Sequence, residues 1–242
     1  MKKYKSRLFF CILGLMIFIC LVAFLNVKVT TKQGVYGQVR IIRIPLYLKI
    51  LDFYDRHYNY QWLVNRIIKD TDSDSERAFK LFKWTCDNIR KAPEGYPIID
   101  DHVWHIIIRG YGVSDQSSDV FSTLCNYAGL DSFFMSIGAK RMPLSFVKLK
   151  NKWCVFDPYR GTYFKDEKGN IADVDTLRFA NWNTEYLKEK PSIDYAELFH
   201  SLPVIEKTGL TRANIQSPLN RFLFEINKFI KRQRVPQNLQ HY

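Results

Sequence analysis

The chain has 242 residues, of which 47% are hydrophobic and 15% aromatic, so it is too apolar for a disordered protein and can form one domain of ordinary size with accessory segments. Lys and Arg number 36 against 24 Asp and Glu, a formal net charge of +12. Such a basic excess is typical of proteins that meet nucleic acid, an anionic membrane surface or acidic glycans. The cations are scattered along the chain without a zinc-finger or RNP motif, which argues against a nucleic-acid partner.

The number and spacing of the five cysteines limit which redox and metal chemistry is possible. Cys11 and Cys20 fall in an apolar N-terminal run, which leaves Cys86, Cys125 and Cys154 for the rest of the chain. An odd number without Cys-x-x-Cys spacing argues against a disulfide framework and against a zinc site. We therefore expect buried thiols, no metal and no cofactor. An enzyme that used Cys125 or Cys154 as its nucleophile would instead be inactivated by thiol alkylation.

The N-terminus predicts a membrane segment. Residues 1–7 carry four cations, and residues 8–25 are uncharged and almost wholly apolar. A helix over residues 8–25 would be about 27 Å long, enough for the hydrocarbon core of a bilayer, and no Ala-x-Ala cleavage site follows it. We therefore expect residues 1–27 to be a basic cytoplasmic start and an uncleaved transmembrane signal anchor. The protein would then be a single-pass membrane protein whose domain lies outside the cytoplasm.

The next segment predicts two helices. Residues 28–72 are expected to form a juxtamembrane tether, in which residues 29–43 could also be a short strand, and a helix that Pro45 opens. Ser73 and Glu76 have the spacing of a capping box. Apolar residues recur at helical spacing after them, so we predict an amphipathic helix over residues 74–90.

A glycine-rich turn then leads into a central helix. Gly110 and Gly112 allow a close approach of the backbone, and Ser114 begins an amphipathic helix predicted over residues 114–128. Three strands are predicted after it, over residues 132–137, 143–150 and 152–156, the last two joined by a tight hairpin. Alternation in the second strand predicts a sheet with one face on the helix and the other toward solvent. The pattern indicates an α+β core, a central helix on a small antiparallel sheet.

These motifs resemble the core of the transglutaminase-like superfamily, which has a papain-like fold. The resemblance rests on the glycine turn before Ser114, on Leu-Ser-Phe-Val at residues 144–147 and on Trp-Cys-Val-Phe-Asp-Pro at residues 153–158. In that family a cysteine starts the helix, a histidine opens the next strand and an aspartate ends the strand after it. The resemblance places these three positions at Ser114, Leu144 and Asp157, so only the aspartate is kept.

The resemblance also divides the chain. It covers about residues 73–177, and we expect residues 73–182 to be the transglutaminase-like domain. Residues 183–242 are expected to be a C-terminal helical extension. Its last helix, from Ser217, either packs on the domain or lies on the membrane as a basic amphipathic helix.

The leading functional prediction is a domain that has lost acyl-transfer catalysis. A serine needs an adjacent base to take its proton, and Leu144 cannot supply one. The domain would then be a binding or scaffolding module in the cell envelope, for an envelope protein, a peptide or a glycan, and the resemblance suggests a place in surface-polysaccharide assembly. Trp104, Asp115 and Gln116 are candidates to line its cleft, although the last two equally suit helix capping.

The alternative is a serine-based hydrolase or acyltransferase that uses Ser114. Residues 100–109 hold His102 and His105 just before the glycine turn, and either one is a candidate for a recruited base, with Asp157 orienting it. The other interpretation of this segment is a helix start with polar histidines at the surface.

Overall fold

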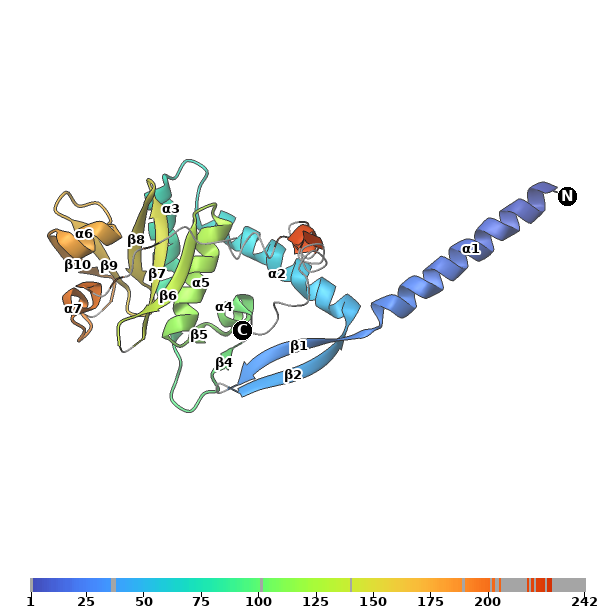
Figure 1. Ribbon diagram of the computed structural model, residues 1–242, viewed down its shortest axis with the longest axis horizontal. Helices are drawn as coiled ribbons and strands as arrows, with labels where there is room; N and C mark the ends of the chain where they lie inside the picture. Colours follow the sequence, from blue (N-terminus) through green and yellow to red (C-terminus); the bar gives the residue numbers. More distant parts are fainter. Residues whose placement is uncertain are drawn as a thin grey trace, which may run out of the picture.

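The computed structural model describes residues 2–35, 38–100, 102–139, 141–188 and 190–200, together with the short pieces 202, 205, 217, 219, 221–224 and 226–227. Most of the C-terminal helix predicted from Ser217 therefore lies outside the described residues. The described chain folds as α+β, with helices packed around a small sheet (Figure 1).

A five-stranded antiparallel sheet forms the centre of the domain. Its strands lie in the order β10-β9-β8-β7-β6, with β6 at Ser132–Ile137, β7 at Met142–Leu149, β8 at Lys152–Asp157, β9 at Thr162–Asp166 and β10 at Trp182–Tyr186. The hairpin predicted between β7 and β8 is present, and its two loop residues, Lys150 and Asn151, have φ values of 48° and 66°. Left-handed backbone at both positions matches the twist of a two-residue hairpin loop.

Helices cover both faces of this sheet. Helices α3 (Asp74–Asn88) and α5 (Ser114–Tyr127) lie on one face, where Phe82, Phe121 and Phe156 pack at centroid distances of 5.2 to 5.8 Å. Helices α6 (Val174–Phe179) and α7 (Tyr195–His200) lie on the other (Figure 1). The solvent-facing side predicted for β7 is thus wrong, because α6 and α7 build a second core there around Phe164 and Phe199.

The capping box predicted at the start of α3 is present. The Ser73 hydroxyl accepts a hydrogen bond from the Glu76 amide at 3.4 Å, and the Glu76 carboxylate accepts one from the Ser73 amide at 2.8 Å. Two backbone donors that the helix cannot satisfy internally are thereby paired. These local bonds fix the first turn of α3. The buried face of this helix packs in the main core.

The tether predicted before α3 is ordered structure. Strands β1 (Lys28–Val35) and β2 (Gln38–Pro45) form a hairpin that β4 (Ile99–Asp100) joins, and α2 (Leu46–Ile67) follows it. Arg56, His57 and Tyr60 are among the buried residues of α2, which packs on α3 and α5. The last small elements are α4 (Val103–Arg109) and the parallel pair of β3 (Arg90–Lys91) and β5 (Tyr111–Gly112).

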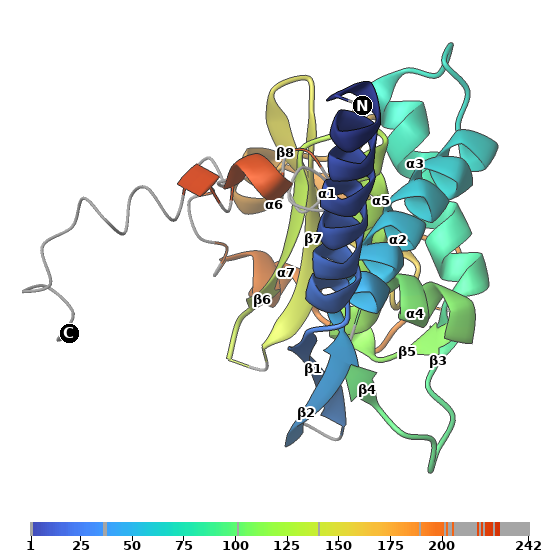
Figure 2. The same cartoon turned by 90° about the vertical axis from the view of Figure 1, so that its right-hand side faces the viewer.

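The first helix, α1 (Lys2–Leu25), extends away from the sheet and its helices (Figure 1), and in Figure 2 it lies in front of them. Within the described part of the chain, no helix combines the length and the apolarity needed to cross a membrane. The expected N-terminal transmembrane helix is therefore corrected.

Candidate functional site

The candidate site begins at the N-terminus of α5, where two glycines shape the approach of the chain. Gly110 ends α4 with a φ of 69°, the left-handed region that favours glycine. At Gly112 an added Cβ would lie 3.0 Å from Gln116 Oε1 and 3.1 Å from Gln116 Cβ, so only glycine fits without displacement. Ser114 follows as the first residue of α5 and is half-buried.

Gln116 and Asp115 serve the helix start. The Gln116 side chain accepts a hydrogen bond from the Val113 amide at 3.3 Å and donates one to the Ile99 carbonyl at 2.8 Å, and the residue is only 5% exposed. Asp115 accepts a hydrogen bond from the Gln116 amide at 2.8 Å. Both residues, which the sequence left open as cleft or capping groups, make capping contacts here.

The two histidines lie on α4 and at its start, and His105 faces α2. The His105 Nε2 atom lies 4.0 Å from the Asp52 carboxylate of α2, and the His102 and His105 rings meet edge to face at 5.7 Å. Trp104 packs against the buried Tyr60 ring at 5.3 Å and belongs to the edge of the main core. Among the described residues, no hydrogen bond joins the Ser114 hydroxyl to either histidine.

The positions that the resemblance gives to histidine and aspartate lie side by side in the sheet. Ser145 of β7 pairs with Phe156 of β8, and continuing this register by one residue brings Leu144 opposite Asp157. Leu144 is fully buried among apolar side chains of the second core. The strand is tied to α5 one turn beyond Ser114, because the Ser145 hydroxyl donates to the Ser118 carbonyl at 3.2 Å.

Asp157 is fully buried and paired. One of its oxygens accepts a hydrogen bond from the Arg160 amide at 3.1 Å. The other accepts from the Arg160 guanidinium at 3.0 Å and from the Tyr195 hydroxyl at 2.8 Å. Burial and the neighbouring carboxylate raise the pKa of Tyr195, which keeps this hydroxyl a donor. The acid position therefore holds a satisfied structural carboxylate whose described partners are a cation and a phenol.

The cysteines of the folded part are shielded thiols. Cys86, Cys125 and Cys154 are all buried. Burial raises the pKa of Cys86 and of Cys154 to about 12, and it raises the pKa of Cys125 well above its usual value. A thiolate is the nucleophilic form of cysteine, so none of the three is prepared for catalysis near neutral pH.

Metal ligands do not gather in the described residues. Within those ranges no group of three or more His, Cys, Asp or Glu side chains is arranged to hold a metal ion. The hollow that the structure does describe lies elsewhere, between α2 and α3, and none of the three positions discussed above lines it. The sequence did not predict this hollow, because it forms where α2 and α3 meet and the residues that line it match no motif.

No family model matches the sequence, and no curated protein matches it either. Among solved structures, the chain is similar to a "putative cysteine protease" from Cytophaga hutchinsonii, with 13% identity and a TM-score of 0.38 over 60% of this chain and 58% of that one. It is also similar to a "putative protease" from Parabacteroides distasonis, with 10% identity and a TM-score of 0.35 over 53% of this chain and 35% of that one. The chain thus spans less than two thirds of either structure, and a likeness this distant carries no argument about activity.

Proposed function

We propose that this chain is a transglutaminase-like domain that has lost acyl-transfer chemistry and works as a binding module. The observation that carries the proposal is the pairing of Asp157, whose carboxylate is bound by Arg160 and Tyr195. In a catalytic triad the acid orients the base and stabilises its protonated form. Here its described hydrogen-bond partners are Arg160 and Tyr195, neither of which is a histidine, and the neighbouring base position is Leu144.

The chemistry of Ser114 supports the same proposal. A serine hydroxyl becomes a nucleophile only when a base within hydrogen-bond reach takes its proton. The helix dipole at the start of α5 stabilises a negative charge there, but it does not remove a proton from the serine hydroxyl. Losing a triad member in a serine protease costs about 10⁴ to 10⁶ in rate, so a domain with Leu144 as its base position retains little acyl transfer.

A fluorophosphonate probe, which labels activated serines, tests the catalytic part of the proposal. The full chain and its Ser114→Ala variant should be labelled equally weakly. Ser136→Ala, an exposed serine on β6, is the matched control. Labelling that disappears in Ser114→Ala and persists in Ser136→Ala would contradict the proposal and favour the serine hydrolase.

A complementation assay tests whether the Ser114 hydroxyl is needed in cells. In cells that lack the gene and show a phenotype, the Ser114→Ala chain should restore the wild-type phenotype as well as the unchanged chain does. Circular dichroism of the purified variant checks that its fold is intact. Failure of a folded Ser114→Ala chain to complement would mean that the hydroxyl is used chemically.

A further inference from the structure

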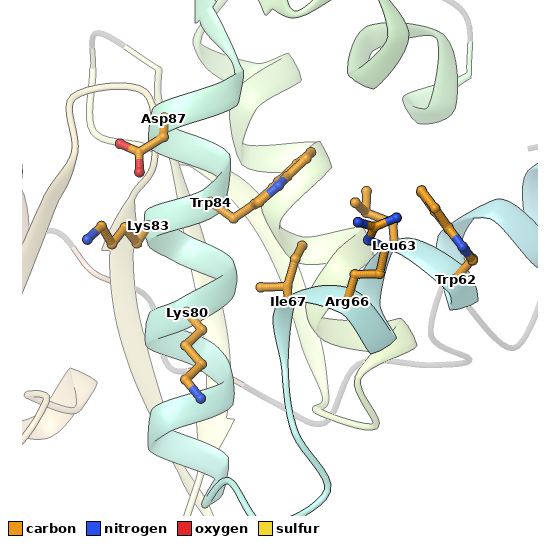
Figure 3. A pocket seen from close by; sticks show the side chains of 8 residues that line it. All are labelled: Trp62, Leu63, Arg66, Ile67, Lys80, Lys83, Trp84 and Asp87. Atoms are coloured by element: carbon orange, nitrogen blue, oxygen red, sulfur yellow. The ribbon is translucent and has the colours of Figure 1, made fainter.

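A hollow of about 500 Å³ lies between α2 and α3 (Figure 3). This volume falls within the range of ligand pockets, roughly 300 to 1,000 Å³. Four residues of each helix line it, so the chain segments that form its two walls are rigid. It is separate from Ser114, Leu144 and Asp157, and what it binds does not depend on whether those positions are catalytic.

The floor of the hollow is apolar. Ile67 of α2 and Trp84 of α3 point into the space between the helices in Figure 3, and both pack against the main core. Leu63 also lines the hollow and is 9% exposed. A ligand that enters the hollow therefore meets an indole and two aliphatic side chains held by the core.

The α2 wall carries a second tryptophan that is stacked with a cation. Trp62 is 55% exposed, which is unusual for the largest apolar side chain, and the Arg66 guanidinium carbon lies 4.8 Å from its ring centre. Such a contact restrains both side chains before any ligand binds. Preorganised groups lose less conformational freedom on binding, so the pair is ready to present a ring face and a cation together.

The charges of the hollow suit a single anionic group. Lys80 lies 2.6 Å from the Asp72 carboxylate and is already neutralised. Arg66 and Lys83 have no ion pair among the described residues, and Asp87 lies on the same side of α3 as Lys83, away from Arg66 (Figure 3). A nucleic-acid chain needs a row of unpaired cations along its phosphates, whereas one or two cations suit one carboxylate.

We propose that the hollow between α2 and α3 binds an acidic sugar ring, a carboxylate-bearing pyranose within an oligosaccharide. The C–H groups on one face of the ring stack on the electron-rich face of Trp62, beside the apolar floor that Trp84 forms. The carboxylate pairs with the Arg66 guanidinium, which offers two parallel donors. The apolar floor of the hollow then contacts the C–H groups of the ligand, and Arg66 contacts its carboxylate.

The proposal is tested by titrating the full chain with a galacturonic acid tetrasaccharide. Binding is measured by tryptophan fluorescence and by calorimetry. We expect saturable binding that salt weakens, loss of binding in Trp62→Ala and about tenfold weaker binding in Arg66→Gln, the usual effect of losing a hydrogen bond to a charged group. Cellotetraose, which has the same rings without carboxylates, should bind more weakly. Both variants change exposed residues of α2 and should leave the fold intact.

The chain supplies a matched control for this stack. On α6 the Arg178 guanidinium carbon also lies 4.8 Å from an aromatic ring, that of Phe179, which is 77% exposed and lines no part of the hollow. Phe179→Ala and Arg178→Gln should bind the acidic tetrasaccharide as the wild type does.

Three results would overturn the proposal. The first is an absence of saturable binding up to millimolar tetrasaccharide. The second is binding that Trp62→Ala and Arg178→Gln weaken equally, because this would indicate general attraction to a basic surface. The third is tighter, Trp62-dependent binding of an oligothymidylate, which would assign the hollow to single-stranded nucleic acid.

Discussion

The Tyr195 hydroxyl donates a 2.8 Å hydrogen bond to the Asp157 carboxylate, and this bond connects α7 to the end of β8 across 38 residues of sequence. Asp157 has no exposed surface, and Tyr195 is 4% exposed. A buried carboxylate is tolerated only where its oxygens are paired. Tyr195, which lies in the segment predicted only as a C-terminal helical extension, therefore completes the surroundings of the acid position.

Tyr195→Phe should lower the free energy of unfolding by about 1 to 3 kcal/mol, because it leaves a buried carboxylate with one donor fewer. Urea unfolding followed by circular dichroism measures the change. Tyr58→Phe is the control, since the Tyr58 side chain is 60% exposed and its hydroxyl should contribute little. Equal stability of Tyr195→Phe and the wild type would mean that Arg160 alone satisfies Asp157.

Local signals in the sequence predicted the elements that local interactions build. The Ser73 and Glu76 capping box marks the start of α3, and the glycine turn places Ser114 at the first position of α5. The loop at Lys150 and Asn151 joins β7 and β8 as expected. In each case the residues that determine the structure lie within a few positions of one another, so the local sequence pattern is enough to predict it.

Contacts between distant segments were not predictable in this way. The second face of β7 is buried by α6 and α7, and the alternation of its side chains could not indicate a cover supplied much later in the chain. The hollow at Trp62 and Trp84 likewise depends on how α2 packs against α3. The transmembrane prediction for the N-terminal apolar run is wrong for the described residues, none of whose helices is long and apolar enough to cross a membrane.

The buried thiols predict a selective alkylation pattern. Iodoacetamide at pH 8 should modify Cys11 and Cys20, which are exposed, and leave Cys86, Cys125 and Cys154 unmodified until urea unfolds the chain. Mass spectrometry of the digested protein separates the five sites. Modification of Cys125 or Cys154 in the folded protein as fast as Cys11 would favour a cysteine enzyme.

The same thiols predict alkaline destabilisation. Because burial raises the pKa of Cys86 and Cys154 from 9.0 to about 12, the unfolded chain loses these protons at lower pH than the native chain. Their contribution to stability is present below about pH 9 and is lost as the pH rises toward about 12. Urea midpoints from pH 7 to pH 11 should fall above pH 9, and a Cys86→Ala, Cys154→Ala double variant should show a smaller fall.

Gly112→Ala tests the close approach at the start of α5. The new methyl group would lie 3.0 Å from Gln116 Oε1 and displace a side chain that bonds the Ile99 carbonyl. We expect a loss of about 1 to 3 kcal/mol in unfolding free energy, as for overpacking in a tight site. In the Gln116→Gly background the same change should cost less, because both Gln116 atoms that the methyl group would strike are gone. Equal costs in both backgrounds would contradict the steric explanation.

Asp173 caps α6 and predicts the response to acid. Burial raises the pKa of its carboxyl, but hydrogen bonds from the Lys152 ammonium and the Thr176 amide outweigh burial and leave the pKa below its usual value. The contribution of this carboxylate is therefore present above about pH 4 and is lost as the pH falls through the lowered native pKa.

Asp173→Ala should lower the unfolding free energy by about 0.5 to 2 kcal/mol at pH 7, the usual effect of losing a helix cap. The gap between the variant and the wild type should shrink below pH 4, because the wild-type carboxyl is then protonated as well. Asp175→Ala, which removes an exposed carboxylate from the first turn of the same helix, is the control. A similar loss in Asp175→Ala would mean that general charge, and not the cap and its ion pair with Lys152, stabilises α6.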